Sequence, residues 1–236
     1  MVEPLVLLPG TMCDARVWAT QITVLSYERP VTVAPVWNGE RIEEIASELL
    51  SALPAKFALA GHGMGGVIAL EMLRRAPQRI IRLALVGTNP LADTPQESAH
   101  REPRIIGAKS GRFDQLVETD FLARRLAQGP NKAAASAEMI EMAYALGADV
   151  MVRQERAMQR RRDQQGTLRR ITQPTLVLAG SLDQVVPLKR QEFLAELIPY
   201  AKLHTLEGVG HMPMLEDPEG TTEAIHEWMR QPLVLR

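Results

Sequence analysis

Short apolar segments alternate with amphipathic helical segments along most of this sequence, and this alternation restricts the possible folds more than any other feature. We predict strands at residues 5–8, 31–34, 57–60, 83–86, 175–179 and 202–206. Apolar strands that are separated by helices are typical of a parallel sheet with helices on both faces. The pattern therefore predicts an α/β fold with a doubly wound, mainly parallel sheet of about six strands.

Two helices are clearly marked. Residues 42–53 place their apolar side chains on one stripe, with Glu and Ser side chains opposite. Near the end of the chain, Asp217 is a suitable N-cap and Pro218 suits the first helical position. We expect this last helix to pack on the sheet through a buried face of Ala224, Ile225, Trp228 and Met229.

The region from about Leu91 to Ile171 shows helical periodicity without strand signals. We therefore assign residues 1–90 and 171–236 to the core of the fold and residues 91–170 to an inserted helical cap. The last part of this insertion, residues 153–170, carries seven arginines. Because the three adjacent arginines at 160–162 point in three directions around a helix, we expect a solvated basic face rather than an anion-binding wall.

The composition limits the classes of function. A chain of 236 residues, 46% of them hydrophobic, can bury one sizeable core. Its net charge of -1 gives no field that would hold a nucleic acid or an anionic membrane. A single cysteine, Cys13, cannot form an internal disulfide, and five scattered His match no common zinc spacing. We expect a reduced, cytoplasmic protein without metal, other cofactor, signal peptide or membrane-spanning helix.

The most informative segment is residues 57–73, FALAGHGMGGVIALEML. An apolar strand runs through a glycine-rich turn directly into a helix, and Gly61 and Gly65 would let the strand and the helix approach closely. This turn resembles the nucleophile elbow of the α/β-hydrolase family, whose pattern is G-x-S-x-G. The resemblance covers nearly the whole chain and implies the α/β-hydrolase fold, with the family's leading hairpin reduced or absent.

A second match lies near the start of the chain. Residues 7–18, LLPGTMCDARVW, resemble the loop that follows an early strand in this family, with proline where histidine is common. The resemblance implies that the backbone N–H groups of Thr11 and Met64 form an oxyanion hole. The N–H of Met64 would be assisted by the positive end of the helix that begins there.

Two matches in the C-terminal part would supply the acid and the base. Residues 174–187 resemble the family segment that carries the catalytic acid, here Asp183, and residues 206–218 resemble the loop that carries the base, here His211. The chain order of nucleophile, acid and base also fits the family. By this resemblance, Asp183 would orient the imidazole of His211 and stabilise its protonated form.

The sequence departs from the family at the nucleophile position, where Gly63 replaces serine. Glycine has no hydroxyl group, so the usual acyl-enzyme cannot form, and we expect this chain to be nearly inactive. Two explanations are open: an introduced Ser→Gly change, or a natural loss of the nucleophile. The agreement of Asp183, His211 and the oxyanion loop with the family pattern favours the first.

The resemblance implies hydrolysis of an ester or lactone bond in a small, partly apolar substrate by a Ser-His-Asp triad. Two other functions are open: ligand binding without catalysis, as in a receptor or carrier, and a base-driven reaction of His211 without a covalent step. Candidate substrate-binding residues are His62, Trp37 and Met12, together with Phe113, Phe121, Met139, Met142 and Met158 of the cap. Each of the cap residues could instead pack inside the cap. The pattern does not predict the oligomeric state.

Overall fold

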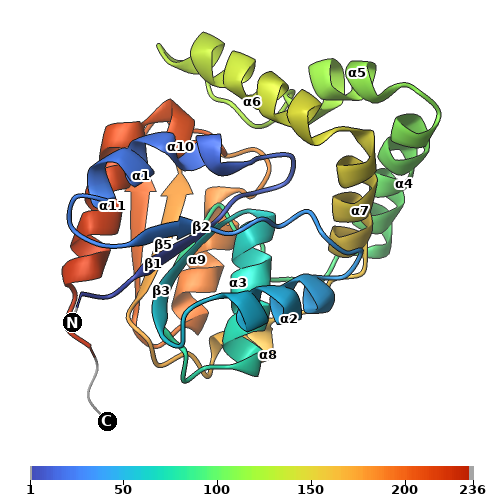
Figure 1. Cartoon of the computed structure of the whole chain (residues 1–236). Coiled ribbons are helices and arrows are strands. Elements are labelled where there is room, and N and C mark those ends of the chain that lie inside the picture. The colour runs from blue at the N-terminus through green and yellow to red at the C-terminus, as the bar shows by residue number, and fades with distance from the viewer. Residues whose placement is uncertain (1, 234–236) are drawn as a thin grey trace.

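A computed structural model describes residues 2–233 (Figure 1). One sheet contains six strands, β1 (Leu5–Leu8), β2 (Val31–Val33), β3 (Phe57–His62), β4 (Ile80–Val86), β5 (Thr175–Gly180) and β6 (Ala201–Leu206). Their order is β2-β1-β3-β4-β5-β6, and every strand pairing in the described part of the chain is parallel. The predicted strands are therefore all present, and β3 and β4 are longer than expected.

Helices cover both faces of this sheet. The side chains of Leu5 and Leu7 belong to one hydrophobic core, whereas those of Val6 and Leu8 belong to another. The first core includes residues of α1 (Ala19–Leu25) and α11 (Pro218–Arg230), and the second includes residues of α2 (Ile42–Ala52), α3 (Met64–Arg75) and α9 (Leu188–Leu197). The prediction of a doubly wound α/β sheet is confirmed (Figure 1).

Both of the marked helices form as expected. In α2 the residues Ile42, Ile45, Ala46 and Leu49 are buried, as the apolar stripe predicts. In α11 the Asp217 side chain accepts a hydrogen bond from the N–H of Gly220, and Pro218 is the first helical residue. The predicted apolar face of α11 is buried against the sheet.

The region between β4 and β5 is helical. It contains α4 (Pro95–Lys109), α5 (Phe113–Gln115), a π-helical turn η2 (Leu116–Phe121), α6 (Lys132–Leu146), α7 (Ala148–Gln159) and α8 (Gln165–Leu168). Helices α4 and α7 pack side by side, away from the sheet (Figure 1). The short α8, at the end of this region, packs against α3, and its residue Leu168 lies in the second core.

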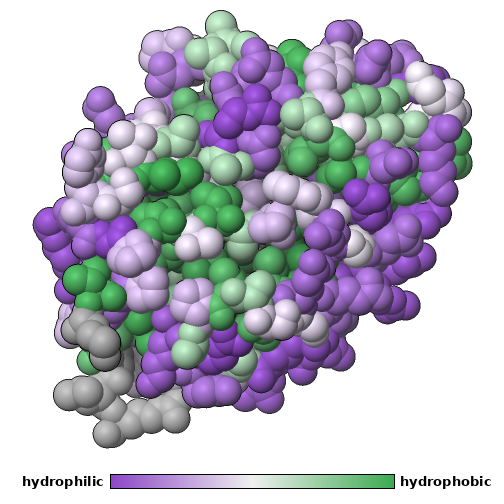
Figure 2. Space-filling model, viewed as in Figure 1, coloured by the Kyte–Doolittle hydropathy of each residue, from purple (hydrophilic) through white to green (hydrophobic). Residues whose placement is uncertain are grey.

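The outer surface is mainly polar. Hydrophilic residues cover most of the rim of the face in Figure 2, and apolar residues are exposed among them near its centre. The largest exposed apolar side chains in residues 2–233 are scattered, for example Tyr27 at 89% and Ile106 at 57%. None of the helices described combines the length and the apolar composition that crossing a bilayer requires.

Candidate active site

A sharp turn joins β3 to α3. Strand β3 ends at His62 and α3 begins at Met64, which leaves Gly63 between them with φ +52° and ψ -113°. This conformation is rare for residues with a side chain. The turn also brings α3 very close to β1, because a Cβ atom on Gly65 would lie 2.5 Å from the carbonyl oxygen of Leu8. The close approach therefore requires glycine at position 65, whereas at position 63 only the backbone conformation favours it.

An imidazole and a carboxylate from two different loops meet opposite this turn. The His211 Nδ1 lies 2.8 Å from Asp183 Oδ2, and both side chains are buried. The other carboxylate oxygen, Oδ1, accepts hydrogen bonds from the N–H groups of Val185 and Val186. Burial alone would raise the pKa of Asp183, but the neighbouring His211 and these hydrogen bonds lower it below its ordinary value. The carboxylate is therefore held ionised and fixes the orientation of the imidazole.

The other ring nitrogen of His211, Nε2, faces the glycine turn. A Cβ atom built on Gly63 would lie 3.6 Å from His211 Nε2 and 4.0 Å from the Cα of Gly10. Both distances are ordinary van der Waals contacts, so the space beside Gly63 accommodates a small side chain. A hydroxyl carried by that Cβ would lie within reach of Nε2, which is the arrangement that nucleophile activation needs.

Thr11 and Met64, the two residues expected to supply oxyanion donors, line the same cavity as Gly63. Thr11 follows β1, and Met64 is the first residue of α3, so its N–H has no acceptor within the helix. The loop after Thr11 is held by the insertion, because the N–H of Met12 donates to Gln154 Oε1 of α7 at 2.8 Å. The hydrogen bond holds Met12 at φ +54°, a value unusual for a residue with a side chain.

His62 packs against the imidazole of His211. Its Nε2–H donates to the backbone oxygen of His211 at 2.9 Å, and the two ring centroids are 4.8 Å apart. Burial, together with repulsion from His211, lowers the pKa of His62 to about 3. His62 is therefore neutral at physiological pH and supports the loop that carries His211.

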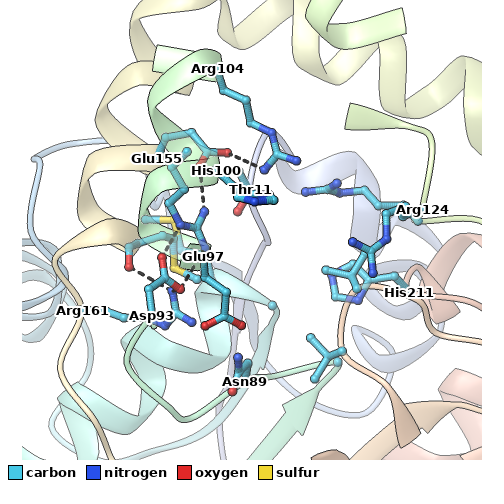
Figure 3. A pocket seen from close by; sticks show the side chains of 18 of the residues that line it. Thr11, Asn89, Asp93, Glu97, His100, Arg104, Arg124, Glu155, Arg161 and His211 are labelled. Atoms are coloured by element: carbon cyan, nitrogen blue, oxygen red, sulfur yellow. Dashed lines mark hydrogen bonds and ion pairs between the residues drawn. The ribbon is translucent and has the colours of Figure 1, made fainter. Parts of the chain in front are cut away.

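A cavity of about 400 Å³ opens over these groups (Figure 3). One wall consists of residues at the carboxyl ends of the strands: Thr11, His62, Gly63, Met64, Gly87 and His211. The opposite wall comes from the helical insertion and is strongly charged: it includes Asp93, Glu97, Arg101, Arg104, Asp120, Arg124, Arg125, Glu155 and Arg161. The site therefore lies between the sheet and the insertion.

A sequence model of the alpha/beta hydrolase family matches residues 5–224. The chain belongs to the alpha/beta hydrolase family. It is 29% identical, over 211 residues that cover 82% of each protein, to a pimeloyl-[acyl-carrier protein] methyl ester esterase of Aromatoleum aromaticum.

Solved structures of hydrolases have the same fold. A thermophilic esterase from Thermogutta terrifontis, solved with malate bound, matches with a TM-score of 0.88 and 25% identity, covering 97% of this chain and 89% of the esterase. The enol-lactonase from Burkholderia xenovorans LB400 matches with a TM-score of 0.87 and 20% identity, covering 98% of this chain and 92% of the lactonase. These two structures show that the chain has the alpha/beta hydrolase fold.

The hydrolase cavity contains only part of the predicted substrate-binding set. His62 and Met158 line it. Met12 and Phe121 instead border a smaller cavity behind it, of about 10 Å³. Met139 and Met142 are fully buried in the first core, and Trp37 and Phe113 pack against that core. Of the five cap residues that we expected to include the lining of an apolar acyl pocket, Met158 lines the cavity, whereas Phe113, Phe121, Met139 and Met142 do not. The helix faces that carry these four residues pack against neighbouring elements instead.

The expected solvated arginine face is also wrong at one position. Arg162 is exposed, but Arg161 is only 5% exposed and lines the cavity. Its guanidinium forms an ion pair with Asp93 and donates to the carbonyl oxygens of Leu91 and Met158. The adjacent arginines do point in different directions, and the side chain of Arg161 points into the cavity.

Sequence reasoning missed most of the charged cavity wall. Arg101, Arg104, Arg124 and Arg125 lie on the insertion, outside every matched motif, and no spacing in the sequence marks them. Gln154 was missed for the same reason. Within residues 2–233 no group of three or more His, Cys, Asp or Glu is arranged to hold a metal ion.

Proposed function

We propose that this chain has the active site of an ester or lactone hydrolase, with Gly63 at the nucleophile position and the helices α4 to α7 acting as a cap over the site. One observation carries the proposal. A Cβ atom on Gly63 would point into the cavity and lie 3.6 Å from His211 Nε2, whose partner nitrogen is bonded to Asp183.

The serine form of this site would act in two steps. The hydroxyl of a serine at position 63 would attack the ester carbonyl carbon while His211 Nε2 takes its proton. The N–H groups of Thr11 and Met64 would stabilise the negative oxygen of the tetrahedral intermediate. His211 would then protonate the leaving alcohol, and a water activated by the same nitrogen would hydrolyse the acyl-enzyme. Asp183 would hold the imidazole in place throughout.

The glycine form can follow only a slower route. It has no hydroxyl group to form an acyl-enzyme, so hydrolysis requires a water that His211 activates directly. Hydrolases that lack a triad member keep about 10³- to 10⁴-fold catalysis over water from the oxyanion hole and from binding. We therefore expect slow residual hydrolysis from the chain as it stands.

The test is to restore the nucleophile. Gly63→Ser is expected to raise hydrolysis of short acyl esters and lactones by several orders of magnitude. The double variant Gly63→Ser with His211→Ala is the matched control and is expected to remain near the level of the parent chain. Equal rates in the two variants would refute the triad assignment.

A ligand-binding protein is the second candidate. It is favoured by the combination of an open, charged cavity with the absence of a nucleophile at Gly63. The residue that the natural gene encodes at position 63 distinguishes a hydrolase from a ligand-binding protein. A natural serine favours hydrolysis, and a natural glycine favours binding. Turnover by the glycine form that disappears with His211→Ala would instead support base-driven chemistry without a covalent step.

A further inference from the structure

Two adjacent arginines lie where the insertion meets the catalytic loops. The backbone oxygen of Arg125 accepts a hydrogen bond from the N–H of His211 at 2.7 Å, and the guanidinium of Arg124 donates to the carbonyl oxygen of Gln184, next to Asp183. Both arginines line the cavity, and Figure 3 shows Arg124 beside His211. The pair is thus placed by the same loops that place the imidazole and the carboxylate.

The other arginines of the cavity are matched by carboxylates. Arg101 forms ion pairs with Asp93 and Glu155. Arg104 forms ion pairs with Asp120 and Glu155, and Arg161 forms one with Asp93. These charges compensate one another, so they do not need a ligand for neutralisation.

Arg124 and Arg125 are matched less closely, since Glu155 and Asp120 act on Arg125 without forming an ion pair with it. Neither forms an ion pair with any residue of the described chain. Arg125 donates from Nη1 to the carbonyl oxygen of Phe121 at 2.7 Å, and its guanidinium stacks over the Phe121 ring at 4.1 Å. Burial, with repulsion from Arg104, lowers the pKa of Arg125 to about 10, so the group stays charged at neutral pH. A guanidinium has five N–H donors, and most of those on this pair have no acceptor among residues 2–233.

The charge balance of the cavity indicates what would complete it. The lining contains five arginines and four carboxylates, those of Asp93, Glu97, Asp120 and Glu155. One positive charge is therefore left over at neutral pH. A carboxylate, with a single negative charge, matches this excess, whereas a phosphate group with a charge of about -1.5 to -2 exceeds it.

We propose that Arg124 and Arg125 bind a carboxylate of the substrate, so that the ester or lactone bond is presented to position 63 by a molecule that also carries an anionic group. The substrate class is thus a small anionic ester, such as the half-ester of a dicarboxylic acid. The inference rests on the proposed function for the position of the reacting bond, but the anion site itself depends only on the two arginines.

Binding to the unaltered chain tests the anion site without any turnover. Monomethyl adipate and dimethyl adipate differ in one carboxylate, and isothermal titration calorimetry at pH 7.5 and low salt measures both. We expect the half-ester to bind at least about tenfold more tightly, since hydrogen bonds to charged groups are stronger than neutral ones. Arg124→Gln, and Arg124→Gln with Arg125→Gln, should remove this preference, whereas Arg112→Gln, which changes an exposed arginine outside the cavity, should keep it.

Three results would overturn the anion site. One is equal affinity for the half-ester and the diester in the unaltered chain. Another is an unchanged preference for the half-ester in the Arg124→Gln variant. Arg124 is exposed, and the thermal unfolding curve of this variant shows whether it is folded. The third is stronger displacement of the half-ester by inorganic phosphate than by acetate, which would assign the pair to a phosphate group instead.

Kinetics of the Gly63→Ser variant separate this inference from the proposed function. If the variant hydrolyses the diester as efficiently as the half-ester, the hydrolase proposal stands and the anion site is refuted. If the unaltered chain prefers the half-ester but Gly63→Ser hydrolyses neither compound nor any other ester, the anion site stands and the hydrolase proposal is refuted. A preference for the half-ester in both kcat/KM and binding supports both.

Discussion

The substitution of Gly63 by serine should change activity and stability in opposite directions. The added Cβ would meet only His211 Nε2 at 3.6 Å and the Cα of Gly10 at 4.0 Å, so no steric overlap opposes it. The backbone, however, has φ +52° and ψ -113° at this position, and a residue with a side chain there costs about 1–3 kcal/mol. We therefore expect the free energy of unfolding to fall by about that amount, while esterase activity rises by about 10³-fold or more.

Gly63→Ala is the matched control for this prediction. Alanine carries the same Cβ without the hydroxyl, so it should lose about as much stability as serine and gain no activity. Urea unfolding measures the first quantity, and hydrolysis of a chromogenic acetate ester measures the second. An alanine variant as stable as the parent chain would refute the strain at this turn. An alanine variant as active as the serine variant would refute the role of the hydroxyl.

Three further changes test the support of the site. In the Gly63→Ser background, Asp183→Asn should lower kcat by about 10⁴-fold, because the imidazole loses the partner that fixes its tautomer; steady-state kinetics with unchanged circular dichroism would check this. Gln154→Leu should lower the free energy of unfolding by about 1–3 kcal/mol, since it leaves the buried N–H of Met12 without its acceptor, and urea unfolding measures the loss. The pKa of His62 is lowered from 6.5 to about 3 in the folded chain, so between these values the unfolded chain binds a proton that the folded chain does not. Stability should therefore fall by up to about 1.4 kcal/mol per pH unit as the pH decreases through this window, and His62→Gln should remove that part of the slope.

The fold could be predicted from the sequence because its signals are local. Strand β1 and strand β5 are continuous apolar runs, and α2 shows its buried stripe in the order of its residues. The turn at Gly63 was recognisable for a similar reason, since glycines at fixed offsets between a strand and a helix permit only a few geometries. The partners Asp183 and His211 followed from family motifs, and the structure places them in contact.

The charged wall of the cavity could not be predicted in this way. A helix in the insertion presents several faces, and its sequence does not say which face meets the cavity and which meets another helix. Met139 and Arg161 illustrate the problem: the apolar residue packs in the core, and the cationic residue faces the cavity. Met and Phe are common both in ligand pockets and in hydrophobic cores, so composition does not show which of the two a given residue lines.

The sequence by itself determined the six-stranded α/β architecture and the glycine turn at position 63, since each depends on residues close together in the chain. Only the tertiary structure decided which charges share one cavity. Arg125 and His211 are far apart in the sequence and are joined by one backbone hydrogen bond, and Gln154 reaches from the insertion to the loop at Met12. Such contacts arise from the packing of the insertion on the sheet, and no local pattern encodes the direction in which a long side chain finally points.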